Sequence, residues 1–199
     1  MVAEKLLQQT AATATMSRVY ETFLALYPSV HHLSEAIDEN LTALLKPLGL
    51  AYRAAEMRGL AQYLVSHHNS EVPCTMSELL GLPGVGDYCA RAVLSFAYDL
   101  DFAVVDTNVG RLLYRLFSLD GPIPVNPARK KSLVALADSL VPRGRSREYN
   151  FTILDLCAQI CRPTRPKCLQ CPILHVCSFE NDTKASEATE LSSDLSIQA

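Results

Sequence analysis

The sequence predicts an all-α protein, and three observations support this prediction. Apolar residues recur three and four positions apart along almost the whole chain, which is the spacing of an amphipathic helix. Prolines and glycines interrupt the pattern at intervals, as they do between helices. The one strand-like run, residues 102–105, is too short and too isolated to form a sheet. At 199 residues, the chain has the size of one compact unit or of two small lobes that share a cleft.

Each expected helix is bounded by residues that start or stop helices. The first pattern ends before Pro28. Thr75 and Glu78 have the spacing of a capping box, which opens a short helix. Asn126 before Pro127 is expected to cap another helix. In chain order, the predicted helical ranges are 6–26, 34–45, 52–68, 76–81, 87–97, 107–117, 127–141 and 147–160.

The composition is that of an ordinary soluble globular protein. Hydrophobic residues make up 49% of the chain, charged residues 20%, and the net charge is -3. These values exclude a disordered, collagen-like or coiled-coil protein. No apolar run approaches the roughly 20 residues of a membrane helix, and the first residues lack the plan of a signal peptide. We therefore expect an intracellular protein, in the cytoplasm or nucleoid if the source is prokaryotic, with no membrane association.

Charge is unevenly distributed along the chain. Residues 1–102 carry a net charge of -5, residues 103–177 carry +6, and the remainder carries -4. The basic middle segment fits either a DNA-binding surface or an ordinary solvated face, and charge alone does not separate the two. Residues 180–199 are rich in Ser, Thr, Glu and Asp and are expected to form a disordered acidic tail.

Four closely spaced cysteines, in the pattern C-x6-C-x2-C-x5-C, are the strongest chemical signal. They are Cys161, Cys168, Cys171 and Cys177. Intervening prolines disfavour helix there, and four thiols so close together favour a metal site over chance packing. Soft sulfur ligands suit structural zinc or an iron–sulfur cluster, and the spacing alone does not distinguish them. The remaining cysteines are expected to be small buried residues: Cys74, Cys89 and Cys157.

A second signal is the run Leu-Pro-Gly-Val-Gly, which ends in Gly84, Val85 and Gly86 and precedes a helix. Glycines permit a tight turn, and the free amides at the start of the next helix suit a phosphate. The loop is therefore either a grip on a DNA backbone or a simple corner between helices.

Two carboxylates, those of Asp106 and Glu4, lie at positions that suggest a functional role. Asp106 follows an apolar run, so it is either a functional carboxylate or the N-cap of the helix that begins at Thr107. Glu4 lies in an N-terminal helical pattern, where a glutamate is normally a surface residue. The residues alone leave both roles open for each side chain.

Taken together, the LPGVG turn, the VVDTN run and the cysteine array resemble the endonuclease III superfamily of DNA glycosylases over residues 2 to 179. The resemblance implies two helical lobes flanking a DNA-binding cleft: a six-helix barrel lobe (1–102, with a helix-hairpin-helix at about 75–98) and a cluster lobe (103–179). It also implies a 4Fe-4S cluster on the four cysteines, a catalytic role for Asp106, and a DNA-site role for Asn108.

Within that family, Tyr88 bears on the type of reaction. Lyase members carry a lysine there, and a tyrosine cannot form a Schiff base, so we expect a monofunctional glycosylase. Glu4 matches an active-site glutamate. Gln8 and Gln9 are candidates to fill the gap left by the flipped base or to read the orphan base, and Tyr88 to line the base pocket; exposed helix glutamines and a core tyrosine are the open alternative. Arg162 and Arg165 are candidates to contact phosphate.

The resemblance divides between two branches. Residues 49–54, 136–142 and 150–155 are similar to thymine-DNA mismatch glycosylases, which favours T or U opposite G. Residues 7–10 are closer to MutY-type adenine glycosylases, which act on A opposite G or 8-oxoguanine. That alternative stays open, although the chain leaves no room for the extra domain such enzymes usually carry.

The expected partners follow from the family. We expect a monomer that binds double-stranded DNA with a mismatched base, after which an abasic-site endonuclease acts on the product. Family members have about one more helix before the position of Glu4, which leaves a truncated or misassigned start open. Two hypotheses of another class remain: a non-catalytic DNA-binding module, and a zinc-stapled interaction protein.

Overall fold

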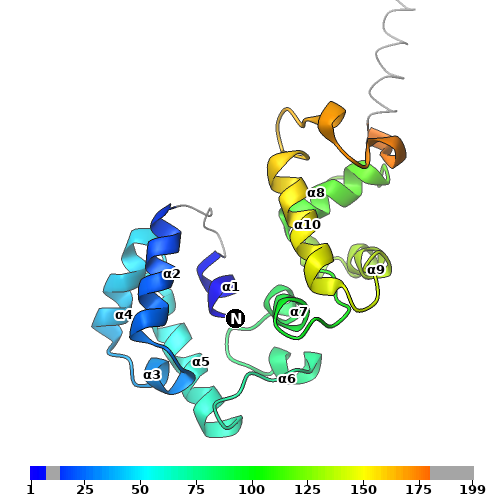
Figure 1. Cartoon of the computed structure of the whole chain (residues 1–199). Coiled ribbons are helices and arrows are strands. Elements are labelled where there is room, and N and C mark those ends of the chain that lie inside the picture. Colours follow the sequence, from blue (N-terminus) through cyan, green and yellow to red (C-terminus); the bar gives the residue numbers. More distant parts are fainter. Residues whose placement is uncertain (8–13, 180–199) are drawn as a thin grey trace, which may run out of the picture. The chain divides into compact units, whose positions relative to one another are not determined.

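In a computed structural model of the protein, the structure of residues 1–7 and 14–179 is described. Within these residues it contains helices and no strand, so the predicted all-α fold class is confirmed (Figure 1). The chain divides into two compact units, Met1–Tyr98 and a second that begins at Asp99. No helix in the described ranges is long and apolar enough to cross a membrane. Gln8, Gln9 and the predicted acidic tail lie outside the described residues.

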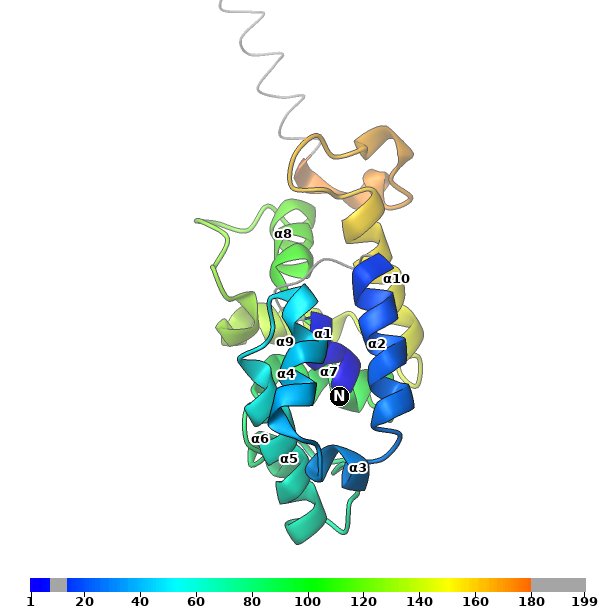
Figure 2. The ribbon, with the colours of Figure 1, turned by 90° about the vertical axis from the view of Figure 1, so that its left-hand side faces the viewer.

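The first unit is a set of helices, most of them short. These elements are α1 (Val2–Leu7), α2 (Ala14–Leu26), α3 (Val30–Ser34), α4 (Asp38–Leu45), the 3-10 turn η1 (Lys46–Leu48), α5 (Arg53–His67), α6 (Met76–Leu80) and α7 (Asp87–Phe96). Helix α5 contacts α3 and α4, and α1 contacts both α2 and α7 (Figures 1 and 2). The first helix of the chain therefore lies beside the helix that follows the LPGVG turn.

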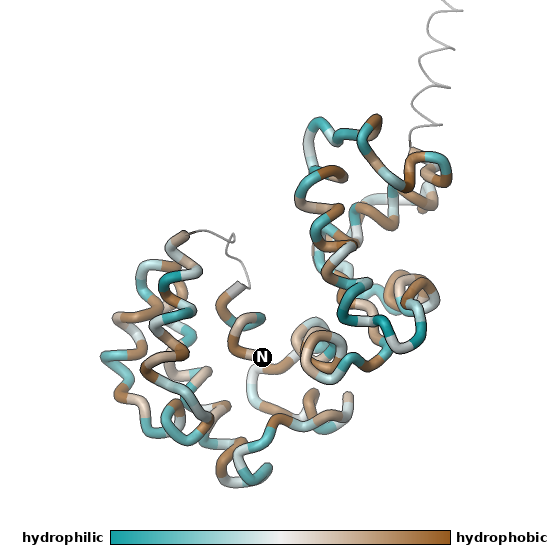
Figure 3. The backbone as a smooth tube through the Cα atoms, viewed as in Figure 1, coloured by the Kyte–Doolittle hydropathy of each residue, from teal (hydrophilic) through white to brown (hydrophobic). Residues whose placement is uncertain are grey.

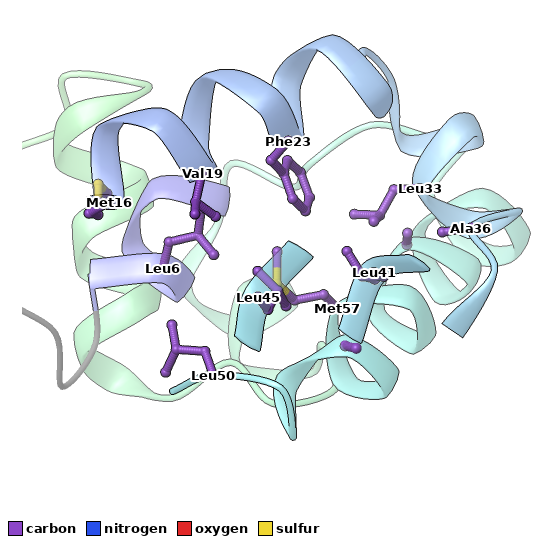
Figure 4. Packing of buried hydrophobic residues seen from close by; sticks show 12 residues of the cluster. Leu6, Met16, Val19, Phe23, Leu33, Ala36, Leu41, Leu45, Leu50 and Met57 are labelled. Atoms are coloured by element: carbon purple, nitrogen blue, oxygen red, sulfur yellow. The ribbon is translucent and has the colours of Figure 1, made fainter. Parts of the chain in front are cut away.

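Amphipathic patterning explains this packing. Hydrophobic and hydrophilic residues alternate along the helical tube in Figure 3. The buried faces supply a core in which Leu6, Phe23, Leu41 and Leu45 are at most 1% exposed (Figure 4). Each such side chain contributes about 1.5–3 kcal/mol through burial. Propensity alone would not hold helices as short as α1 and α3.

The structure corrects one predicted helix in this unit. The range 34–45 was expected to be a single helix, but α3 ends at Ser34 and α4 begins at Asp38. Ser29 caps α3, accepting a hydrogen bond from the His32 amide, so that helix starts earlier than expected. Ile37 is extended and the acidic first turn of α4 suits a new helix N-terminus.

The second unit is built on α8 and α10. Its elements are α8 (Thr107–Leu116), the 3-10 turn η2 (Pro127–Arg129), α9 (Lys131–Ser139), α10 (Ser146–Gln159) and the 3-10 turns η3 (Cys168–Gln170) and η4 (Leu174–Val176). Helix α8 packs against α10, α9 and η2 (Figure 1). Val109, Leu113, Leu133 and Cys157 are among the buried core residues of this unit.

The predicted helix 127–141 is wrong at its start, because the α-helix there, α9, begins only at Lys131. Pro127 opens a 3-10 turn rather than an α-helix, Lys130 is extended, and Asn126 makes no side-chain cap. Pro127 instead packs on α8, where a Cβ on Gly110 would lie 2.6 Å from its Cγ. The capping box at Thr75 is confirmed. The predicted helix 6–26 began too late, because α1 starts at Val2; the structure describes α1 (Val2–Leu7) and α2 (Ala14–Leu26) but not the residues between them.

Candidate active site and cysteine loop

Asp106 is the N-cap of α8, and its carboxylate is held by three hydrogen bonds. Oδ1 accepts from the amides of Asn108 and Val109, at 2.8 and 2.7 Å. Oδ2 accepts from Nδ2 of Asn108 at 2.8 Å. The side chain is half-buried. The predicted capping role is therefore confirmed, and the same bonds fix where the carboxylate points.

A polar chain leads from this carboxylate to the cysteine loop. The Asn108 side chain, predicted to contact DNA, also accepts from Nη1 of Arg111 at 3.0 Å. Arg111, only 8% exposed, donates from Nε and Nη2 to the Cys161 carbonyl at 3.1 and 2.8 Å. Asp106, Asn108 and the first cysteine of the array thus share one hydrogen-bonded network within the second unit.

All four cysteines of the array line one hollow of the second unit. The hollow is otherwise mainly apolar; its lining includes Leu112, Ile160, Pro166, Ile173, Leu174 and Phe179. Cys161 is buried and the other three are half-buried. In residues 1–7 and 14–179, no three His, Cys, Asp or Glu side chains lie close enough together to hold a single metal ion. Four thiols around an apolar hollow provide a soft sulfur donor set that fits a cluster.

Arg115 organises this loop. Its Nη1 donates to the Arg162 carbonyl at 2.8 Å and lies 3.5 Å from Sγ of Cys161. Its Nη2 donates to the Pro163 carbonyl at 3.0 Å, and the guanidinium lies 4.9 Å from the ring centroid of Phe179. One side chain of α8 thereby fixes the backbone that follows Cys161.

The two predicted phosphate-binding arginines have different surroundings. Arg165 is exposed and has a positive φ of 49°. Arg162 is half-buried, and its Nη2 donates to the Arg165 carbonyl at 3.2 Å. Its guanidinium therefore contributes to the loop's own structure, whereas Arg165 is accessible to a phosphate.

In the first unit, the LPGVG turn is tied to α1. Gly84 has a φ of +68°, and its carbonyl accepts from the ammonium of Lys5, which is only 4% exposed. Val85 is buried, so only its backbone can face a ligand. Gly86 is the N-cap of α7. The turn therefore leaves the amides at the start of α7 as its polar surface.

Glu4 and Tyr88 also belong to the first unit. Glu4 is half-buried on α1, and Tyr88 is half-buried in the first turn of α7, the helix that α1 contacts. Arg53 anchors α1 from α5, because its Nη1 donates to the Lys5 carbonyl. Both predicted residues thus lie on helices that contact each other.

The three cysteines outside the array differ in burial. Cys89 and Cys157 are buried as expected, but the prediction for Cys74 is wrong, since it is exposed in the loop before the Thr75 cap. Burial raises the pKa of the Cys157 thiol to about 12, with Cys161 and Asp106 adding to the shift. Cys157 is therefore a thiol at neutral pH.

Sequence patterns did not single out Lys5, Arg111 or Arg115. Each is a charged residue on a helix, where the usual expectation is exposure. Arg111 lies three residues after Asn108 and four before Arg115, on the polar face of its helix, where a solvent-exposed arginine is the ordinary expectation.

A known protein family matches the first two thirds of the chain. Residues 2–137 match the family described as HhH-GPD superfamily base excision DNA repair protein, and the chain belongs to that family. The resemblance inferred from the LPGVG turn, the VVDTN run and the cysteine array is confirmed.

Individual relatives are more specific. The chain is 36% identical to a thymine/uracil-DNA glycosylase of Pyrobaculum aerophilum, over 90% of this chain and 79% of that protein. It is 34% identical to the human adenine DNA glycosylase, over 88% of this chain but 32% of that protein. A solved thermostable thymine-DNA glycosylase superposes with a TM-score of 0.81 at 29% identity, covering 91% of this chain and 82% of the other.

Proposed function

We propose that this protein is a monofunctional DNA glycosylase that removes T or U opposite G from double-stranded DNA. The family assigns it to base excision repair of DNA, and its relatives include thymine/uracil-DNA glycosylases. The observation that carries the proposal is the Asp106 carboxylate, held by three hydrogen bonds at the start of α8.

The reaction needs a fixed negative charge beside the sugar. As the bond from C1′ to the base nitrogen breaks, positive charge develops on the sugar ring, and a preorganised carboxylate stabilises it. Asp106 supplies that charge and orients the attacking water, whose oxygen forms the new bond to C1′. The departing base takes up a proton, with Glu4 as its donor or hydrogen-bond partner. The products are a free base and an abasic site.

Access to C1′ requires the nucleotide to leave the duplex. Extrusion is least costly at a mismatch, where pairing is already weak, and this favours the mispaired base as substrate. The amides of the LPGVG turn and the exposed Arg165 are suited to hold the backbone phosphates during this step.

Tyr88 supports a monofunctional reaction, because it offers no amine at the position where lyase members have a lysine. One lysine, Lys5, does lie near this turn, but it is buried and donates a hydrogen bond to the Gly84 carbonyl. Neither residue therefore provides an exposed amine to attack the sugar.

The cysteine loop is proposed to bind a 4Fe-4S cluster through Cys161, Cys168, Cys171 and Cys177. The cluster would supply a rigid cross-link for the loop, since each thiolate is bound to it covalently. Arg115 and Arg111 hold the same loop from α8. The purified holoprotein should be yellow-brown and contain iron and sulfide; a colourless protein that contains zinc would contradict this assignment.

The direct test is strand cleavage of one labelled duplex carrying T:G, U:G, A:G or A:8-oxoguanine. We expect breaks at T and U opposite G only after hot alkali, which cleaves abasic sites. Breaks without alkali would show lyase activity and contradict the argument from Tyr88. No product from any duplex would favour a non-catalytic DNA-binding module.

A second candidate is removal of adenine opposite G or 8-oxoguanine. It is favoured by the similarity of residues 7–10 to the adenine branch and by the match to the human adenine DNA glycosylase. Cleavage at A instead of T in the same assay would establish it. Under either specificity, a monomer acts first and an abasic-site endonuclease follows.

A further inference from the structure

The segment just before α8, residues 102–105, is held by side chains of two helices. The amide of Ala103 donates to Oδ1 of Asp138 on α9 at 2.9 Å. The hydroxyl of Ser146, at the start of α10, donates to the Phe102 carbonyl at 2.9 Å. These side chains bond to backbone groups that a neighbouring strand would pair with in a sheet.

Asn150 on α10 bonds to this segment in both directions. Its Oδ1 accepts from the Val104 amide at 2.8 Å, and its Nδ2 donates to the Phe102 carbonyl at 2.9 Å. Nδ2 also donates to the Ser146 carbonyl at 2.9 Å. The residue is only 3% exposed. Turning the amide over would set its oxygen against two carbonyl oxygens, so only one orientation satisfies all three bonds.

The segment leads straight into the proposed catalytic carboxylate. Val104 and Val105 are each 1% exposed, and Asp106 follows directly. Because Val104 and Val105 are closely packed in the core, their backbone has little freedom to absorb a displacement, and a shift at Val104 is passed on to Asp106. The cap bonds fix the carboxylate relative to α8, and Asn150 fixes the incoming backbone relative to α10.

We infer that Asn150 is a positioning residue for the Asp106 carboxylate, acting through the backbone of residues 102–105. This inference rests on the proposed function, because it gives Asn150 a catalytic consequence only if Asp106 takes part in base excision. A displacement of about 1 Å in such a group lowers a rate by about 10²-fold, whereas DNA binding need not change.

The informative variant is Asn150→Asp. It keeps the shape and the acceptor for Val104 but sets a carboxylate beside the Phe102 and Ser146 carbonyls. We expect the single-turnover rate of base removal to fall on the order of 10²-fold at pH 8, with the Kd for the duplex unchanged. A protonated carboxyl can donate again, so the rate relative to wild type should recover as the pH falls toward 5.

Two further variants separate positioning from stability. Ser146→Ala removes the hydroxyl that donates to the Phe102 carbonyl and accepts from Asn150 Nδ2 at 3.2 Å, but it keeps the Asn150 bonds to Val104 and Phe102, so it should lower the rate less than Asn150→Asp. Val134 is a buried apolar residue on α9 and makes no side-chain hydrogen bond to residues 102–105. Its replacement in Val134→Ala should reduce thermal stability and leave the rate of base removal by the folded protein unchanged.

The outcomes are distinct. The inference would be overturned if Asn150→Asp removed the base at the wild-type rate. It would also be overturned if Val134→Ala lost as much rate as Asn150→Asp, or if the rate of Asn150→Asp did not recover at low pH. A wild-type protein that removes no base from any duplex would instead overturn the proposed function itself.

Discussion

At the residue scale, Arg111 shows how a buried charge can organise a site. Its guanidinium bonds to the Asn108 side chain and, through two nitrogens, to the Cys161 carbonyl. A lysine cannot reproduce this forked geometry. We expect Arg111→Lys to lower the free energy of unfolding by about 1–3 kcal/mol in urea titrations. The exposed Arg129→Lys is the control and should leave it unchanged; equal effects would refute a specific role for the fork.

The two kinds of cysteine should also differ in reactivity. Only the thiolate is alkylated, and burial raises the pKa of Cys157 from 9.0 to about 12, so the native residue is protonated at pH 8. Cys74 is exposed. Peptide mapping after iodoacetamide treatment should find label on Cys74 and none on Cys157. Label on Cys157 in the folded protein at a similar rate would contradict its buried placement.

The raised pKa also has a consequence for stability. The unfolded thiol ionises near its ordinary pKa of 9.0, while the folded thiol does so only near 12. The contribution of Cys157 is therefore fully present below about pH 9 and is lost as the pH rises toward 12.

At the element scale, close packing between α8 and η2 depends on one glycine. A Cβ at Gly110 would lie 2.6 and 2.8 Å from Pro127 side-chain atoms, whereas a Cβ at Gly59 in α5 would meet nothing within 4 Å. We expect Gly110→Ala to lower stability, because overpacking costs about 1–3 kcal/mol and exceeds the gain in helix propensity. Gly59→Ala should raise stability by up to about 1 kcal/mol. Thermal unfolding of both variants tests this; a stabilising Gly110→Ala would contradict the packing.

The elements that could be predicted are those with local signals. The capping box at Thr75 and the LPGVG turn mark their helices because the responsible atoms lie within a few residues. The single helix expected over 34–45 is wrong, since neither the earlier cap nor the extended Ile37 changes the apolar spacing.

The candidate site was predictable to the same extent. Asp106 was identified from its position after an apolar run, and its capping bonds are local. The partners Arg111 and Asn150 act over about 46 to 50 residues of sequence, and that proximity exists only after folding. Patterns within one sequence do not show which residues this far apart in the chain come into contact.

At the scale of the whole molecule, charge segregation should govern DNA affinity. Residues 103–177 carry +6 within a chain of net charge -3. Each phosphate contact releases counterions, so replacing one contacting arginine lowers the slope of log Kd against log salt by about 0.9. Arg165→Asn removes an exposed charge and suits the positive φ there. For Arg165→Asn we expect the slope of log Kd against log salt to fall by about 0.9, with Kd measured by fluorescence anisotropy.

The control is Arg18→Gln, at an exposed position in the net-acidic first segment. It should leave the slope unchanged. An unchanged slope for Arg165→Asn would remove Arg165 from the set of phosphate contacts.

The central claim is that the Asp106 carboxylate performs base excision, and Asp106→Asn tests it most directly. Asparagine is an equally good N-cap, and its Oδ1 can keep the bonds from the Asn108 and Val109 amides, so α8 and the fold should persist while the negative charge and the bond from Asn108 Nδ2 are lost. We expect the single-turnover rate on a T:G duplex to fall on the order of 10³-fold, with melting temperature and DNA affinity retained. A variant that keeps the wild-type rate, or loses it only together with its fold, would contradict a catalytic role for Asp106.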